Sequence, residues 1–233
     1  MKKKFFLFAG LVLLLCLAVG IACASGISNI NCEMMSNGQV RITWSDSDNA
    51  PPYEVHTMLP GWVSGYYVYD RASYSSPSAI MRTMIPGCTY DIQVINAYGN
   101  AGYATYTLPK STFTDFRKGK SVSIDFNKFD FRSESVYKTF TLKLDYPKLG
   151  ADRMHNYLLA LRTPLGYAAR IEYNEALELK VKWSYIYWDG MDLSKWMNSV
   201  QDCFGSYMSG NYAFEVYLDG KYYDEAQFYV YYD

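Results

Sequence analysis

Hydrophobic and polar side chains alternate at every second position along most of the chain beyond residue 25. In the clearest example, Tyr90, Ile92 and Val94 fall on one side and the residues between them on the other. A period of two is typical of a strand with one buried face. Similar short runs, separated by turn residues, predict about seven strands between residues 27 and 108.

Turn residues divide these predicted strands. An Asn-Gly pair at residues 37–38 predicts a tight hairpin. A Pro-Gly pair at residues 86–87 predicts a corner just before the strand that contains Tyr90. In sandwich folds, a tyrosine at this place packs its ring inside, and its hydroxyl bonds to the backbone upstream. We therefore predict that Tyr90 locks the corner and that Trp44 and Ile92 belong to the same core.

The second half of the chain continues the alternation and adds one different pattern. The longest alternating run extends from Leu177 to Tyr187 and predicts a single long strand. In residues 192–204, apolar side chains instead recur at spacings of three and four. This spacing predicts a helix, with Asp192 as its N-terminal cap and Gly205 as its stop.

The chain ends in a predicted hairpin with an Asp-Gly turn at residues 219–220. A strict register through this turn would set Glu215 opposite Asp224. Like charges that face each other destabilise a sheet. We therefore predict a β-bulge near residues 224–226 that returns apolar side chains to the core face at Phe228.

Several of these motifs occur together in one known family. They are Trp44 in the second strand, Tyr53-x-Val55 in the third, and Ile85-Pro86-Gly87-Cys88-Thr89-Tyr90-x-Ile92-x-Val94 followed by Asn96-Ala97-Tyr98-Gly99. In this set, residues 27–108 resemble a fibronectin type III domain, with a shorter gap between Trp44 and Tyr53 than the family usually shows. The terminal hairpin is similar to that of bacterial secreted β-sandwich modules.

The predicted fold is therefore all-β, with two β-sandwich domains in tandem. Residues 25–109 form the fibronectin type III-like domain, and residues 110–119 form a linker. Residues 120–233 form a second, immunoglobulin-like sandwich with one short helix. The resemblance implies a role in extracellular interaction, but the integrin-binding Arg-Gly-Asp triplet of some family members does not occur in this sequence.

The start of the chain predicts export. Three lysines precede an apolar run at residues 5–21, and Ala22-Cys23-Ala24 provides an A-x-A cleavage site. We predict a signal peptide over residues 1–24 and a secreted or cell-surface product. Two alternatives place the protein at a membrane: a retained apolar segment, or a lipid attached to Cys23.

Three cysteines lie beyond the predicted signal peptide, and export permits disulfides. In a fibronectin-like topology, Cys32 and Cys88 come to the same end of the domain, so they are a candidate disulfide. Cys203 lies on the apolar side of the predicted helix, where we expect a buried free thiol.

Charge and motif content argue against several function classes. The chain carries 22 Lys and Arg against 23 Asp and Glu, which gives no electrostatic footprint for nucleic acid. The two histidines, His56 and His155, have no nucleophile motif beside them, and no zinc-ligand spacing occurs. We therefore predict a protein that is not an enzyme and uses no metal or cofactor. Residues 46–49 begin like a calcium loop, but they lack its glycine and distal glutamate, so we expect them to cap their own backbone.

Aromatic side chains are the remaining functional signal, since they make up 18% of the chain. One stretch combines five of them: Trp62, Tyr66, Tyr67, Tyr69 and Tyr74. Three more alternate with the core positions of the last hairpin: Tyr217, Tyr229 and Tyr231. Exposed tyrosines are effective recognition groups because they offer a large rigid area at low entropic cost.

These observations predict an exported, non-catalytic protein that binds an extracellular protein or glycan. A carbohydrate-binding module that uses the stretch from Trp62 to Tyr74 is the alternative function. A competing structural interpretation is that packing between the two domains buries part of these rings.

Overall fold

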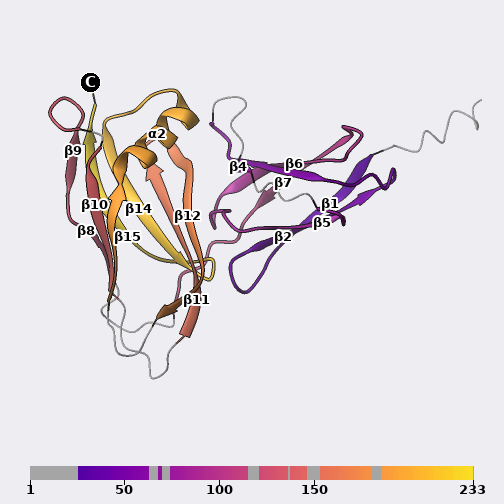
Figure 1. Ribbon diagram of the computed structural model, residues 1–233, viewed down its shortest axis with the longest axis horizontal. Coiled ribbons are helices and arrows are strands. Elements are labelled where there is room, and N and C mark those ends of the chain that lie inside the picture. Colours follow the sequence, from indigo (N-terminus) through magenta and orange to yellow (C-terminus); the bar gives the residue numbers. More distant parts are fainter. Residues whose placement is uncertain are drawn as a thin grey trace, which may run out of the picture.

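The computed structural model describes residues 26–62, 68–69, 74–114, 121–135, 137–145, 153–179 and 185–232. Within this part of the chain there are 15 strands and one helix, arranged as two β-sandwiches side by side (Figure 1). The prediction of an all-β fold with a single short helix in the second unit is confirmed. The predicted signal peptide lies outside the described residues.

The N-terminal sandwich has one three-stranded and one four-stranded sheet, with strand orders β1-β2-β5 and β4-β3-β6-β7. Its strands are β1 (Ile27–Met34), β2 (Val40–Asp46), β3 (Glu54–Met58), β4 (Val68–Tyr69), β5 (Ser78–Met81), β6 (Thr89–Ile95) and β7 (Ala101–Thr107). This arrangement of seven antiparallel strands in two sheets is the one that the fibronectin type III resemblance implies.

The core of this sandwich follows the predicted alternation. Trp44, Tyr90, Ile92 and Val94 are all buried, and Asp91 is exposed between them. The Trp44 ring meets the edge of the Tyr53 ring at a centroid distance of 5.2 Å. Burial of one face of each strand drives the two sheets together.

The predicted tyrosine corner is present. The buried Tyr90 hydroxyl accepts a hydrogen bond from the Ile85 backbone N–H at 2.8 Å. Gly87 turns the chain between them with φ +85°, a left-handed conformation that favours glycine.

We expect Tyr90→Phe to lower the free energy of unfolding by about 1–3 kcal/mol, because it leaves the buried Ile85 N–H without its acceptor. Urea denaturation measures this loss. Tyr103→Phe is the matched control: Tyr103 is 74% exposed, and its hydroxyl accepts from Gln93 Nε2 at the surface. Equal losses in the two variants would contradict a structural role for the corner.

The C-terminal sandwich has a three-stranded and a five-stranded sheet, with strand orders β13-β10-β8 and β12-β11-β14-β15-β9. Its strands are β8 (Ser121–Ile124), β9 (Lys128–Asp130), β10 (Thr139–Asp145), β11 (Arg153–Thr163), β12 (Gly166–Leu179), β13 (Tyr185–Asp192), β14 (Gly210–Leu218) and β15 (Lys221–Tyr231). Strand β9 pairs with β15 in parallel, and the other pairs are antiparallel.

One strand prediction in this domain is wrong. The run from Leu177 to Tyr187 is two strands, because β12 ends at Leu179 in the five-stranded sheet and β13 begins at Tyr185 in the other sheet. The buried face also changes, because Tyr187 is 50% exposed and its neighbour Trp188 packs against the core. An alternating run in the sequence therefore identifies neither the partner strand nor one continuous buried face.

Helix α2 (Leu193–Phe204) confirms the predicted caps. The Asp192 carboxylate accepts from the Ser194 N–H at 2.9 Å, and Gly205 ends the helix with φ +72°. Its apolar side, formed by Leu193, Trp196, Met197 and Val200, is part of the sandwich core.

The helix also covers the free edge of β12. Ser199 Oγ accepts from the Arg170 N–H at 2.7 Å, and Cys203 Sγ accepts from the Ala169 N–H at 3.1 Å. Edge strands with unsatisfied backbone groups invite pairing with other chains. The polar side chains of α2 satisfy two such groups.

The predicted bulge in the last hairpin is confirmed, one residue before the predicted range. Tyr217 pairs with Tyr222, and Val216 then pairs with Asp224, so Tyr223 is the extra residue. The shift places Phe228 in the core, as expected, but it does not separate the acids, because Glu215 pairs with Glu225 in place of Asp224.

The predicted linker begins as part of the C-terminal sandwich. The Phe113 N–H donates to the Tyr222 carbonyl at 2.8 Å, and the Tyr222 N–H donates to the Ser111 carbonyl at 2.8 Å. The Phe113 ring is buried and meets the edge of the His155 ring. Residues 115–120 lie outside the described residues.

The predicted disulfide between Cys32 and Cys88 is not formed, since Cys32, Cys88 and Cys203 are all free thiols. Cys32 lies in β1, paired with Ile42. Cys88 instead lines a cavity at the boundary between the two sandwiches. Contact with the second domain therefore gives Cys88 a different environment from the one that a single fibronectin-like domain would provide.

Burial should make these thiols slow to react. It raises the pKa of Cys32 and of Cys203 to about 11, and that of Cys88 to about 12. Because the thiolate is the reactive form, alkylation at pH 8 should be at least about 100-fold slower than in the unfolded chain, and slowest at Cys88. For a chain that begins at Ser25, which has three cysteines, intact mass after iodoacetamide treatment should show three labels in urea and none after brief native treatment. One label in urea would instead indicate a disulfide.

Candidate functional site

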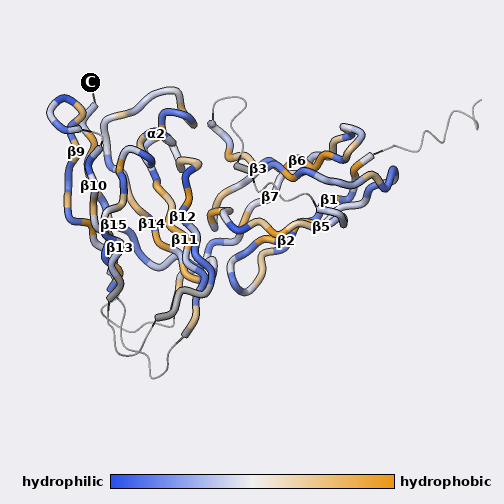
Figure 2. Tube along the Cα trace, viewed as in Figure 1, coloured by the Kyte–Doolittle hydropathy of each residue, from blue (hydrophilic) through white to orange (hydrophobic). Residues whose placement is uncertain are grey.

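The two sandwiches share an extensive apolar boundary. Leu158, Ala160 and Tyr217 on the outer face of the five-stranded sheet belong to the same buried cluster as the N-terminal core. Leu159 and Leu161, the intervening residues of β11, face the C-terminal core. Both faces of β11 and β14 are therefore buried along this stretch, and Figure 2 shows the resulting concentration of hydrophobic residues on these two strands.

This boundary overturns part of the predicted aromatic surface. Trp62 is only 8% exposed, and its indole N–H donates to the Tyr167 carbonyl of the other domain at 2.8 Å. Tyr217 is fully buried, and Tyr74 is half-buried against the same cluster. The expected exposure of Trp62 and Tyr217 is wrong, because the second domain covers faces that one domain alone would expose.

The other predicted tyrosines differ in outcome. Tyr66 and Tyr67 lie outside the described residues, and for Tyr69 the structure describes the backbone of β4 but not the side chain. Tyr229 and Tyr231 are exposed by 37% and 40%, as their phase in the hairpin predicts.

Polar contacts fix the orientation of the two domains. Gln39 Nε2 donates to the Tyr173 hydroxyl at 2.9 Å and to Glu175 Oε1 at 3.0 Å. Arg82 pairs with the same glutamate at 3.2 Å.

Two hairpin turns meet at this boundary. A Cβ atom on Gly38 would lie 2.2 Å from the Gly220 backbone nitrogen, so the two turns touch through their backbones. The Asp219 carboxylate holds the second turn by accepting from the Asn156 N–H at 2.9 Å and contacting His155 Nδ1 at 2.7 Å. Asn156 Nδ2 also donates to the Asn37 carbonyl at 3.0 Å, which connects the turns directly.

A carboxylate is buried beside these apolar contacts. Glu215 is 3% exposed, and the bulge in β15 sets it opposite Glu225. Arg162 bridges the two acids, with Nε 2.5 Å from Glu215 and Nη2 2.8 Å from Glu225. The hydroxyls of Tyr167 and Tyr217 donate to Glu215 Oε2 at 2.8 and 2.6 Å.

The tyrosines in this cluster stay neutral. Burial, followed by the charge of Glu215, raises the pKa of Tyr217 and Tyr167 far above that of free tyrosine. For Glu225, burial acts to raise the pKa, but hydrogen bonds from Gln227 and Arg162 outweigh it and the pKa falls. Neutral hydroxyl donors and a charged arginine together satisfy the buried acid, so the cluster is structural.

A small cavity of 230 Å³ lies at the same boundary, lined by Leu59, Pro60, Trp62, Cys88, Thr89, Gly166, Tyr167 and Phe204. Most of its lining is apolar, and it offers few polar groups to orient a ligand.

An exposed aromatic surface lies at the end of β15 away from its hairpin turn. We name it the aromatic patch. Tyr229 and Tyr231 lie on the outer face of the strand, and Tyr232, in phase with the buried Val230, lies on the other side with Phe131 and Tyr207. The Tyr229 and Tyr231 rings are 4.6 Å apart, and the Phe131 and Tyr207 rings stack at 4.5 Å. Tyr232 is 40% exposed and meets the edges of both Phe131 and Tyr207.

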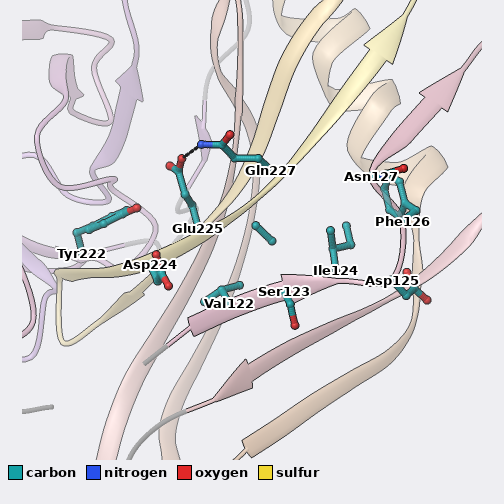
Figure 3. Close-up of a pocket in the computed structure, with 11 residues that line it drawn as sticks. Val122, Ser123, Ile124, Asp125, Phe126, Asn127, Tyr222, Asp224, Glu225 and Gln227 are labelled. Atoms are coloured by element: carbon teal, nitrogen blue, oxygen red, sulfur yellow. Dashed lines mark hydrogen bonds between the residues drawn. The ribbon is translucent and has the colours of Figure 1, made fainter. Parts of the chain in front are cut away.

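A second hollow, a groove of 860 Å³, lies between β8 and β15 (Figure 3). Val122, Ser123 and Ile124 line one side, and residues 224–227 line the other. Asp125 lies at one end of the β8 side, and Tyr222 lies at one end of the β15 side.

The remaining chemical candidates have structural roles. Asp46 accepts from the Asp48 and Ala50 N–H groups at 3.0 and 2.8 Å, which confirms the predicted cap. His56 contacts Glu54 at 3.3 Å. Across the described ranges, no group of three or more His, Cys, Asp or Glu side chains could hold a metal ion. The same ranges contain no helix that is long and apolar enough to cross a membrane.

No protein-family model matches this chain, and no curated protein is similar to it in sequence. Among solved structures, the chicken CNTN1 FN1–FN3 domains share 13% identity, with a TM-score of 0.31, over 89% of this chain and 67% of that one. A two-domain fibronectin type III segment of chicken tenascin shares 10% identity, with a TM-score of 0.32, over 88% of this chain and 97% of that one. At these values neither likeness supports a conclusion, and the fold rests on the strand order described above.

Proposed function

We propose that this chain is an exported, non-catalytic protein that binds an extracellular or cell-surface protein through its aromatic patch. The observation that carries the proposal is the pair of Tyr229 and Tyr231, each more than a third exposed and with rings 4.6 Å apart, at one end of a paired strand. Contiguous exposed aromatic rings are costly in water and are enriched at interaction sites.

The patch is held in position before any partner arrives. Arg132 lies over the Tyr231 ring at 5.8 Å, and its guanidinium makes two hydrogen bonds of 2.9 Å to Asp130. These bonds lower the pKa of Asp130 to about 2, so the pair stays charged at neutral pH. Tyrosine and arginine that are already oriented lose little entropy on binding, which is typical of hot-spot residues.

Carbohydrate binding at the aromatic patch is the second candidate function. Two adjacent exposed rings, such as those of Tyr229 and Tyr231, offer apolar faces on which a sugar can stack. Trp62 itself does not support this candidate, because it is buried.

Site-specific photocrosslinking tests the protein-binding proposal. A benzophenone amino acid in place of Tyr231 should form protein adducts on the surface of producing cells. The same residue in place of Tyr98, which is 75% exposed on the N-terminal sandwich, is the control. Identical adducts at both positions, or none at Tyr231, would overturn the proposal. A glycan-array signal lost in Tyr231→Ala would favour the second candidate.

Export itself is tested by intact mass of the product recovered outside the cytoplasm. We expect a chain that begins at Ser25. A mass that includes a lipid on Cys23, or an uncleaved start, would replace the secreted form with one of the two membrane-attached alternatives.

A further inference from the structure

The outer edge of β15 is paired at both ends and open between them. At one end, Tyr222 exchanges two hydrogen bonds of 2.8 Å with residues 111–113. At the other, the Tyr229 N–H donates to the Asn127 carbonyl at 2.9 Å, where β9 runs parallel to β15. Among the described residues, no strand pairs with residues 223–228 on this side.

The open interval presents backbone hydrogen-bonding groups to the groove. In an antiparallel pair, alternate residues direct their N–H and C=O groups to opposite edges of the strand. Tyr229 directs its groups away from β14, so Glu225 and Gln227 do the same. Strand β8 does not take them up, because it pairs with β10 in the other sheet.

The groove carries negative charge at its rims. Asp125 and Asp224 line it and form no ion pair within the described ranges, and the described lining contains no lysine or arginine. Glu225 also lines the groove, but Arg162 balances its charge. Between the rims, the buried side chains of Val122 and Ala226 provide an apolar floor.

We propose that this groove binds an extended peptide segment of another protein that carries lysine or arginine. The segment adds to β15 as a short strand, with its backbone bonded to Glu225 and Gln227 and its cationic side chains beside Asp125 and Asp224. Strand addition obtains affinity from backbone hydrogen bonds and specificity from alternate side chains. The six open residues span about 20 Å, which suits a segment of similar length.

This site is separate from the aromatic patch, and its test does not involve the patch. The probe is a blocked, dye-labelled hexapeptide of alternating valine and lysine, measured by fluorescence anisotropy on the exported full chain. Its counterparts are a valine–glutamate peptide and a valine–lysine peptide with alternate backbone nitrogens methylated. Methylation removes hydrogen-bond donors from the ligand without any change to the fold of the protein.

We expect both counterparts to bind at least about tenfold more weakly than the probe. Asp125→Asn with Asp224→Asn should weaken the probe about five- to tenfold, whereas Asp202→Asn on helix α2 should leave it unchanged. Bound probe should also slow amide exchange at Glu225 and Gln227. Failure to bind at 1 mM, equal affinity for the methylated or glutamate peptide, or no effect of the double variant would overturn the proposal.

Discussion

Replacement of Arg162 by methionine is expected to lower the free energy of unfolding by about 2–4 kcal/mol. The change removes the partner of Glu215, which is 3% exposed and cannot regain solvation in the folded state. Removal of one member of a buried ion pair typically costs about 3–5 kcal/mol. The lower range applies here because the Arg162 side chain is 38% exposed, and the tyrosine hydroxyls still donate to the acid.

Urea denaturation at pH 7 measures this effect, and two further variants define its cause. Arg132→Met removes the partner of Asp130 at the surface and should cost much less than Arg162→Met, because solvent screens an exposed ion pair. The double variant Arg162→Met with Glu215→Gln should be more stable than Arg162→Met alone, because the amide carries no buried charge. A double variant no more stable than the single one would show that lost packing, and not the unpaired charge, is responsible.

Gly38→Ala is expected to destabilise the protein by at least about 2 kcal/mol and to loosen the domain boundary. The new methyl group would lie 2.2 Å from the Gly220 nitrogen, a distance at which the two hairpin turns must separate. Strain adds to this cost, because Gly38 has φ +83°. Gly220→Ala should act similarly, since its Cβ would lie 2.5 Å from the Gly38 Cα.

The variant Gly99→Ala separates the cost of the contact between the turns from the cost of the strained backbone. Gly99 has φ +81°, but no atom lies within 4 Å of the added Cβ, so we expect only the backbone cost of about 1 kcal/mol. Urea denaturation gives the energies, and small-angle scattering should show a larger radius of gyration for Gly38→Ala alone. Equal behaviour of Gly38→Ala and Gly99→Ala would mean that the contact between the turns contributes nothing.

Local patterns in the sequence predict most individual elements of this fold. The corner at Tyr90, the caps at Asp192 and Gly205, and the bulge before Glu225 each depend on residues within one turn or one hairpin. Such features follow from backbone geometry and from the alternation of apolar side chains, both of which can be worked out over short distances in the chain.

The domain boundary could not be predicted in the same way. Alternation identifies which side chains share a face, but it does not identify what covers that face. Trp62 and Tyr217 were therefore expected at the surface. One available signal was the almost continuous apolar run from Tyr212 to Leu218, because such a run is typical of a strand buried on both faces.

The aromatic patch and the groove differ in the same way: local patterns predict the first but not the second. The phase of the last hairpin predicted the exposure of Tyr229 and Tyr231. The groove depends on where β9 joins β15 and where β8 leaves for the other sheet, and no pattern within one strand reports that choice. The environments of Trp62 and Cys88 depend on residues that are distant in the chain, so no local pattern predicts them.

Strands β11 and β14, which are buried on both faces, have a consequence for dissection and engineering. Separation of the two domains near residue 109 would expose an apolar surface on each of them, so neither domain is well suited to study by itself. Domains joined in this way cannot be exchanged independently of each other. A mechanical force applied to one domain is transmitted directly to the other.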